Sequence, residues 1–193
     1  MARGHAEALA PMVDVVMREA ALGMGAIDRL AVTIGPGTFT GTRVGLAFMR
    51  GLALAIGRPL AGVASLDAMA AEALAHESAP LAAAIVDARR GEVYLGARGA
   101  GGETRLAPAL LSFDRALDVL AAMTVSPVAL AGSAAEAMSA ALAARGVAAT
   151  DSGVRNPDAV FVARLGVDAP AGETPPRPLY LRAPDAKLPA ARP

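Results

Sequence analysis

The sequence predicts an α/β fold of two lobes, for three reasons. A short apolar run at 30–34 leads through a glycine-rich loop into a helical segment and then into a second apolar run, "PLAGVAS". This order of strand, loop, helix and strand is typical of a βαβ unit, whose two strands are parallel. A β-hairpin is predicted further on, at 80–99, and a chain of 193 residues has room for two lobes.

Residues 1–79 are predicted to form the first lobe, which starts with an amphipathic helix from about His5 to Ala21. The apolar residues of this helix recur at three- and four-residue steps, so they fall on one stripe. They are Leu9, Met12, Val13, Val16 and Met17. A buried strand is predicted next, from Leu30 to Ile34, because the run is apolar and is bounded by charge and by Gly-Pro.

A second helix is predicted from about Thr40 to Ile56. Gly57 and Pro59 indicate where it ends, because glycine favours the left-handed conformation after a helix and proline stops further helix. After the second strand, Ser65 is predicted to cap a helix from Leu66 to about His76. A serine hydroxyl at that position accepts hydrogen bonds from the free amides of the first turn.

The second lobe is predicted at 80–170 and opens with the hairpin. Its strands, Leu81 to Val86 and Glu92 to Arg98, flank the polar turn "DARRGE", in which Gly91 is expected to adopt the unusual backbone angles. Further helices are predicted at 113–123, 134–145 and 159–167, and a further strand at 127–131. Residues 171–193 are rich in proline and are predicted to form a strap that returns to the first lobe, with "LYLR" as a strand.

Charge and composition argue against several classes of function. The chain has 18 basic and 18 acidic residues, so it has no net field to attract nucleic acid. Only 3% of the residues are aromatic, which predicts a core of Ala, Leu and Val and few rings for base stacking. The lack of cysteine excludes disulfides and thiolate chemistry. No signal peptide or membrane span is recognisable, so we expect a cytoplasmic protein with no membrane partner.

The loop "TIGPGTFTGTRVG" at 33–45 has two interpretations that the sequence leaves open. A glycine-rich turn between a strand and a helix lets backbone amides bind a phosphate at the positive end of the helix. The candidate residues are Gly35, Gly37, Thr38, Thr40 and Gly41. The Walker and dinucleotide-binding patterns are both missing. The simpler interpretation, which we favour, is that the glycines turn the chain and, with Gly45 and Gly51, let another backbone approach the helix, either within the lobe or from a partner.

Metal sites have little support in the sequence. His5 and His76 are its only histidines and form no i, i+4 pair, so no metal and no cofactor is predicted. A magnesium site made of carboxylates alone, at Asp67 or Asp87, stays open. Single acids at helix starts and hairpin turns more often act as caps.

The serines offer no recognisable nucleophile. Ser65, Ser112 and Ser133 all lie outside a GxSxG elbow. Ser133 is better explained as a helix cap, with Glu136 completing a capping box.

The turn "DARRGEVY" concentrates charge at one place. Arg89 and Arg90 are candidates for bidentate contacts with a partner's carboxylates or with RNA phosphates. A solvated hairpin tip is the equally simple alternative, because charges commonly gather there.

Several stretches resemble the TsaB family, also called YeaZ. "GPGTFTGTRVGLAFMRGLALAIGRPLAGVASLDAMA" resembles the signature loop and helix of that family, and "HAEALAPMV" resembles its first helix. "IVDARRGEVY" is similar to its domain junction and "PLYLRAPDAKLP" to its C-terminal segment. The resemblance covers nearly the whole chain and is most specific through residues 35–69.

The resemblance implies an actin-like or hexokinase-like fold, of the ribonuclease H-like type. It also implies a non-catalytic subunit in bacterial synthesis of N6-threonylcarbamoyladenosine in tRNA. Such a subunit docks on a TsaD-like catalytic subunit, with a TsaE-like ATPase as third member and tRNA reached only through the complex. The docking surface, which family members also use for homodimers, is expected on the first two helices. Its apolar residues are Leu9, Met12, Val16, Val44, Phe48 and Leu52.

The catalytic relatives carry an HxEGH metal pair after the strand that follows this helix. Aligned by eye, Ser65 and Met69 hold the two histidine positions here. Neither residue is a ligand that hard or borderline metals prefer. The resemblance and the composition therefore agree in predicting a chain without that metal centre.

The chain departs from the family at its beginning. Family members begin with a β-hairpin that carries a DTS-like turn, whereas this chain starts at the helix that follows. We expect a mis-set start codon or a truncated product, with an uncovered sheet edge and exposed apolar surface in the first lobe. The alternative function is an ATP-binding phosphotransferase or nucleotide hydrolase of the same fold, which would use the loop from Gly35 to Gly41.

Overall fold

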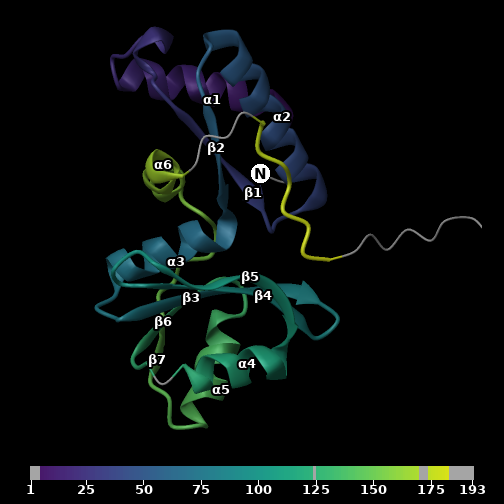
Figure 1. Ribbon diagram of the computed structural model, residues 1–193, viewed down its shortest axis with the longest axis vertical. Coiled ribbons are helices and arrows are strands. Elements are labelled where there is room, and N and C mark those ends of the chain that lie inside the picture. The colour runs from purple at the N-terminus through teal and green to yellow at the C-terminus, as the bar shows by residue number, and fades with distance from the viewer. Residues whose placement is uncertain (1–4, 124, 170–173, 183–193) are drawn as a thin grey trace, which may run out of the picture.

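The described residues form two sheets, one in each lobe, and the lobes lie end to end along the long axis of the molecule (Figure 1). This computed structural model describes residues 5–123, 125–169 and 174–182. In the first sheet, β1 (Leu30–Gly35) pairs in parallel with β2 (Leu60–Ala64). The predicted βαβ unit is therefore confirmed.

The second sheet has the strand order β5-β4-β3-β6-β7, with an antiparallel β3–β4 hairpin as predicted. Its strands are β3 (Leu81–Arg89), β4 (Glu92–Gly99), β5 (Thr104–Ser112), β6 (Val128–Ala131) and β7 (Ala149–Asp151). The helices are α1 (His5–Glu19), the 3-10 turn η1 (Met24–Ala26), α2 (Phe39–Ile56), α3 (Ser65–His76), α4 (Phe113–Ala122), α5 (Ala135–Ala143) and α6 (Ala159–Asp168). In the part of the chain that the structure describes, no helix has the length and apolar character to cross a bilayer.

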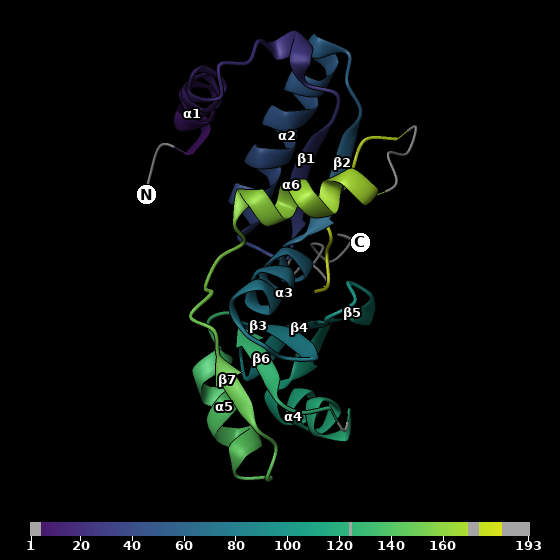
Figure 2. The same cartoon turned by 90° about the vertical axis from the view of Figure 1, so that its left-hand side faces the viewer.

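Helices cover both faces of the first sheet, as is typical of parallel sheets. On one face Val32 and Leu60 pack with Leu46 of α2. On the other face Ala31 and Val63 lie against α6 (Figure 2). Neighbouring residues thus alternate between two helices, which explains why both strands are continuous apolar runs.

Helix α6 connects the end of the second lobe back to the first sheet. It lies ahead of the boundary predicted at residue 170, yet it packs on β1 and β2. Gly166 is so close to Ala31 that a Cβ atom at position 166 would overlap the Cβ of Ala31. Arg29 donates a hydrogen bond of 3.0 Å to the carbonyl of Gly166. The division into lobes at 79 and 170 stays a prediction.

Helix α3 lies between the two sheets (Figure 2) and is buried on several sides. Leu66 and Met69 pack against a row of fully buried alanines on the second sheet. These alanines are Ala82, Ala84, Ala129 and Ala131. On the opposite face of that sheet, α4 and α5 contribute Leu120 and Met138 to a second core. The predicted core of small apolar residues is confirmed, and its alanines let the helices approach closely.

Two predicted helix caps are wrong. Ala64 holds the N-cap of α3, so Ser65 is the first helical residue and its side chain makes no cap hydrogen bond. Ala134 holds the N-cap of α5, again without a side-chain bond. The Ser133 hydroxyl instead accepts a hydrogen bond of 2.9 Å from the backbone N–H of Asp87. It therefore joins α5 to the end of β3, a use that local sequence does not reveal.

Strands β5 and β7 were not predicted, and the strand predicted at "LYLR" is wrong. Strand β5 contains a proline and has two irregularities in its register with β4, while β7 is only three residues long. Neither gives a clear alternating pattern. In the last described segment the Leu179 N–H donates to the Ile34 carbonyl at 2.8 Å, but no strand forms. The prolines that precede Leu179 have no N–H to donate to a ladder.

The contact between α6 and β1 can be tested with two glycine substitutions in helices. Gly166→Ala should lower the free energy of unfolding by roughly 1–3 kcal/mol, because its methyl group overlaps Ala31. Gly51→Ala in α2 meets no described atom within 4 Å, so it should raise stability by about 0.5–1 kcal/mol. Chemical denaturation measures both. Equal effects of the two substitutions would contradict the close packing.

Candidate functional site

A cavity of about 590 Å³ lies between the lobes, where strand ends from both sheets converge. Strand β1 leads into the glycine-rich loop, β2 into α3, and β3 into the hairpin turn. In open α/β sheets, ligands bind at the carboxyl ends of the strands. The predicted residues that line the cavity are Gly37, Thr38, Gly41 and Arg89. Those that do not line it are Gly35, Thr40 and Arg90.

The glycine-rich loop uses part of its hydrogen-bonding capacity within itself. Thr38 caps α2: its hydroxyl accepts from the Gly41 N–H at 3.2 Å, and its carbonyl accepts from the Thr42 N–H at 3.0 Å. A Cβ atom at position 41 would lie 2.6 Å from the Thr38 hydroxyl, so this cap requires glycine. The Gly41 amide, which the phosphate interpretation needs, is therefore already bonded.

Within the described chain, the close packing predicted along α2 is wrong at two of its glycines, while the approach of a partner there stays a prediction. A Cβ atom at Gly45 or Gly51 would meet no described atom within 4 Å. Gly35 does have a conformational role, because its φ of +107° is unfavourable for other residues and it turns the chain out of β1. Within the described residues, the glycines serve the turn and the cap rather than a helix–helix contact.

The hairpin turn has a strained backbone. Arg89 and Arg90 have φ angles of 67° and 59°, and Gly91 follows with 73°. Side chains larger than glycine rarely adopt such angles. The Asp87 carboxylate stabilises the turn by accepting a hydrogen bond of 2.8 Å from the Arg89 N–H. The sequence predicted unusual backbone angles at the glycine only, so the positive φ angles of the two arginines are a finding of the structure.

A second arginine that lines the cavity is neutralised by an acid. Arg155 donates two hydrogen bonds to the two carboxylate oxygens of Asp151, at 2.7 and 2.6 Å. This hydrogen bonding lowers the pKa of Asp151 below its ordinary value.

The two acids considered as magnesium ligands have other contacts. Asp87 bonds the hairpin backbone, as described. Asp67, in the first turn of α3, lies 3.6 Å from Arg98 of β4. Burial raises the pKa of Asp67, and the nearby Arg98 offsets only part of this effect. Within the described ranges, no group of three or more His, Cys, Asp or Glu side chains is placed to hold a metal ion.

Ser65 and Met69 both line the cavity on the side of α3. They are nearly inaccessible to solvent, with exposed fractions of 7% and 2%. They lie one helical turn apart, so their side chains share one face of α3. A hydroxyl and a thioether therefore lie at the two positions that align with the metal-binding histidines of the catalytic relatives.

Helices α1 and α2 enclose an apolar groove of about 210 Å³. Its lining residues are Leu9, Met12, Val13, Val16, Met17, Phe48 and Met49. Met12 and Val16 are 53% and 60% exposed, which is high for large apolar side chains. Four of the six predicted docking residues thus line one groove, whereas Val44 and Leu52 are half-buried on α2 outside it.

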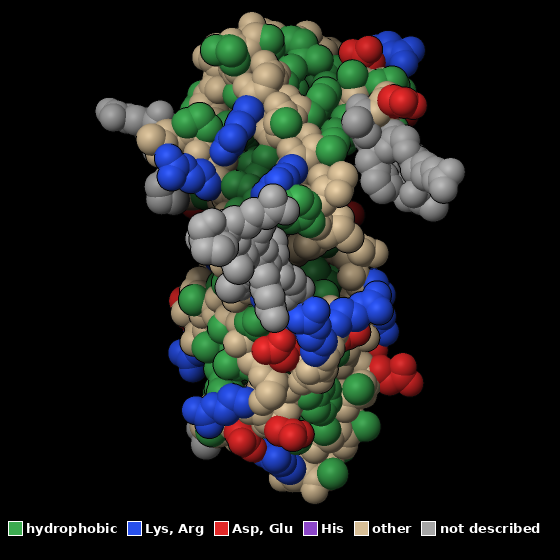
Figure 3. Space-filling model, turned by 90° about the vertical axis from the view of Figure 1, so that its right-hand side faces the viewer, with side chains coloured by type: hydrophobic (Ala, Val, Ile, Leu, Met, Phe, Trp, Pro, Cys, Tyr) green, Lys and Arg blue, Asp and Glu red, His purple; other side chains and the backbone are tan. Residues whose placement is uncertain are grey.

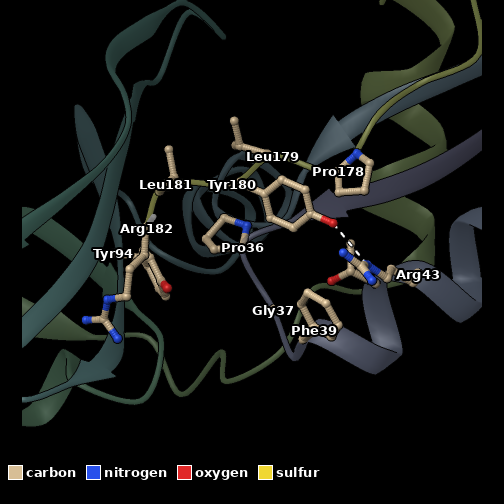
Figure 4. A pocket seen from close by; sticks show the side chains of 11 residues that line it. Pro36, Gly37, Phe39, Arg43, Tyr94, Pro178, Leu179, Tyr180, Leu181 and Arg182 are labelled. Carbon is tan, nitrogen blue, oxygen red and sulfur yellow. Dashed lines mark hydrogen bonds between the residues drawn. The ribbon is translucent and has the colours of Figure 1, made fainter. Parts of the chain in front are cut away.

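A further cavity, of about 380 Å³, was not predicted from the sequence. It lies beside the glycine-rich loop and is closed by the segment at 178–182 (Figure 4). Phe39, Arg43 and Tyr180 lie together on one of its walls. The sequence shows that aromatic residues are scarce, so a cluster of them would be notable. Only the fold shows that several of them lie together here.

Comparison with known proteins identifies the family. A family model described as TsaD, tRNA N6-adenosine threonylcarbamoyltransferase, matches residues 1–155. A crystal structure from Pseudomonas aeruginosa, of an uncharacterised protein with similarity to peptidase YeaZ, superposes with a TM-score of 0.74 at 31% identity, covering 92% of this chain and 84% of that one. YeaZ from the same organism superposes with a TM-score of 0.66 at 33% identity, covering 83% and 75% of the two chains.

The chain is a TsaB/YeaZ-like member of the TsaD family. Its predicted α/β, actin-like fold is thereby confirmed. An uncharacterised protein of Mycobacterium tuberculosis is 37% identical to this TsaB/YeaZ-like chain over 189 residues, covering 96% of this chain and 79% of the relative. The tRNA threonylcarbamoyladenosine biosynthesis protein TsaB of Haemophilus influenzae is 39% identical over 92 residues, covering 48% and 39%. This TsaB/YeaZ-like chain is therefore related to components of threonylcarbamoyladenosine synthesis.

The raised pKa of Asp67 predicts a pH dependence of stability. A carboxyl group whose pKa is raised on folding stabilises the folded state below its ordinary pKa of 3.8, and this contribution is lost as the pH rises through the folded-state pKa. Asp67→Asn removes this titration. The unfolding free energy of the variant, relative to the natural chain, should therefore increase from pH 3 to pH 7. Urea denaturation at both pH values measures the difference, and a decrease would contradict the burial effect.

Proposed function

We propose that this chain is a non-catalytic partner subunit that binds and stabilises a TsaD-like catalytic subunit in threonylcarbamoyladenosine synthesis. A TsaE-like ATPase would be the third member, and tRNA would be reached only through the complex, in the cytoplasm. The formal net charge of zero supports the indirect role toward tRNA. The similarity to TsaB over 92 residues supports the choice of pathway.

The apolar groove between α1 and α2 is the observation that carries the proposal. A contiguous exposed apolar patch on a folded chain is typical of a site where another protein binds. Met12 and Val16 project from α1 with more than half of their surface exposed, and Phe48 and Met49 of α2 form the other wall. Burying such side chains contributes about 1.5–3 kcal/mol each.

The proposed interface continues along α2 beyond the groove. Val44, Phe48 and Leu52 follow one another at four-residue steps, so they lie on one side of the helix. Together with Leu9, Met12 and Val16 they would give a partner helix pair a continuous apolar surface. The same surface can pair with a second copy, so we include a homodimer as an alternative state of the free chain.

The contents of the interlobe cavity support a non-catalytic assignment. Ser65 and Met69 offer a hydroxyl and a thioether at the position aligned with the metal pair of the catalytic relatives, and neither is a preferred ligand of hard or borderline metals. Arg155 is paired with Asp151, and the Gly41 amide is capped by Thr38. These groups make hydrogen bonds within the fold, which leaves them less available to bind a reacting phosphate.

A matched pair of valine substitutions tests the proposed interface. Val16→Asp places a charge in the groove and should weaken binding to a TsaD homologue by at least about tenfold, because a charge buried without a partner is strongly unfavourable. Val167→Asp is the control, since this valine is 66% exposed on α6, close to the 60% of Val16. Calorimetry measures both affinities, and circular dichroism checks folding. Failure of the natural chain to bind near micromolar concentration, or equal loss in both variants, would refute the interface.

A further inference from the structure

Aromatic residues are concentrated around the cavity beside the glycine-rich loop. The chain has four phenylalanines, two tyrosines and no tryptophan. Phe39 and both tyrosines, Tyr94 and Tyr180, line this cavity of about 380 Å³ (Figure 4). Phe39 and Tyr180 are 62% and 57% exposed, so these rings contribute little to the core. Exposed aromatic residues next to arginine are typical of the side chains that dominate binding energy at protein interfaces.

The two rings hold Arg43 in a fixed orientation. Its guanidinium carbon lies 3.6 Å from the centroid of the Phe39 ring, and its Nε donates a hydrogen bond of 3.0 Å to the Tyr180 hydroxyl (Figure 4). One face and one edge of the guanidinium are therefore occupied. Among the described residues, neither Nη atom of Arg43 has a hydrogen-bond or ion-pair partner. Within the described chain, the two Nη groups therefore form an unoccupied fork of donors.

Among the residues that the structure describes, no acidic side chain forms an ion pair with Arg43. Arg43 lies near the N-terminal end of α2, whose first turn contains no acidic residue. The helix dipole adds partial positive charge at this end. The other arginine that lines the cavity, Arg182, is paired with Glu92, so it does not need a further anion. In the space-filling view apolar side chains cover much of the upper lobe (Figure 3).

We propose that this cavity binds an extended segment of a partner protein in which an acidic side chain lies next to an apolar one. The carboxylate would accept two hydrogen bonds from the Nη atoms of Arg43, the bidentate geometry that arginine provides. The neighbouring apolar side chain would fill the space lined by Pro36, Tyr94 and Leu181. This site is separate from the groove between α1 and α2, and the proposal does not rest on the function of that groove.

The geometry favours an acidic peptide over a nucleotide. A base needs a free aromatic face on which to stack. Arg43 already covers one face of Phe39, and its guanidinium carbon also lies 5.8 Å from the centroid of the Tyr180 ring, so a base that stacked on these inner faces would have to displace the arginine. The free groups are thus a planar fork of donors and an apolar space, which match a carboxylate and an aliphatic side chain.

Tyrosine fluorescence of the isolated chain can test the proposal directly. Since the chain has no tryptophan, its emission comes from two tyrosines that both line this cavity. Tyr94 also lines the interlobe cavity, so variants of Arg43 are needed to assign the signal to this site. The blocked tripeptide acetyl-Leu-Asp-Leu-amide should change the emission with a saturable, roughly millimolar dissociation constant. The matched peptide with asparagine in place of aspartate should bind at least about tenfold more weakly, because it lacks the charge.

Variants of Arg43 identify the residue that binds the carboxylate. Arg43→Gln should weaken binding of the aspartate peptide by at least about tenfold, and Arg43→Lys should restore only part of it, since lysine keeps the charge but not the fork. Arg164→Gln is the control, because Arg164 lies 5.1 Å from the Phe161 ring in a similar stacked pair on α6. This control should bind the peptide as the natural chain does.

Three results would overturn the proposal. The first is the absence of saturable binding of the aspartate peptide at concentrations up to about 10 mM, which is well above the expected dissociation constant. The others are equal affinity for the asparagine peptide and an equal loss of affinity in Arg43→Gln and Arg164→Gln. Tighter binding of uridine monophosphate than of the aspartate peptide would show that the site takes a nucleotide instead. Thermal unfolding of each variant, followed by circular dichroism, separates loss of binding from loss of fold. None of these measurements involves a catalytic subunit, so their outcome is independent of the proposed function.

Discussion

Burial of the β1–β2 sheet between α2 and α6 is the constraint on which the rest of the structure depends. Two strands alone cannot form a stable layer, so both faces must be covered by helices. One cover, α2, follows directly in the sequence, whereas α6 follows the second lobe and approaches β1 closely at Gly166. The first sheet is therefore covered in part by a helix that comes after the second lobe in the sequence.

This arrangement places the strand ends of both lobes around one cavity. The loop after β1, the start of α3 and the hairpin after β3 all face it, and the residues after β7 close it. Several polar groups there are already used by the fold, as the Thr38 cap, the Asp151–Arg155 pair and the Asp87 contact show. In the described part of the chain, two other surfaces offer binding capacity: the apolar groove of α1 and α2, and the adjoining cavity where Arg43 lies beside two exposed rings.

The parts of the fold that could be predicted from the sequence are those set by local physical chemistry. The βαβ unit follows from its apolar runs, and the end of α2 follows from Gly57, which does adopt the left-handed conformation with a φ of 65°. The caps at Ser65 and Ser133 failed because a serine near a helix start can bond elsewhere, as Ser133 does to Asp87. Strand β5 was missed because its proline and irregular register hide the alternation. The glycine-rich loop and Arg89 were found as candidates, but that they share a cavity depends on how the lobes meet.

The sequence by itself determined the order of elements in the first lobe, the small-residue core, the turn at Gly91 and the family resemblance, because each depends on residues that are close along the chain or on composition. Only the tertiary structure decided what α6 covers, which acids and serines are already bonded, and that Phe39, Arg43 and Tyr180 form one site. The last of these joins positions 137 residues apart at a hydrogen bond of 3.0 Å. Contacts at such separations depend on the path of the whole chain, which short-range sequence patterns do not predict.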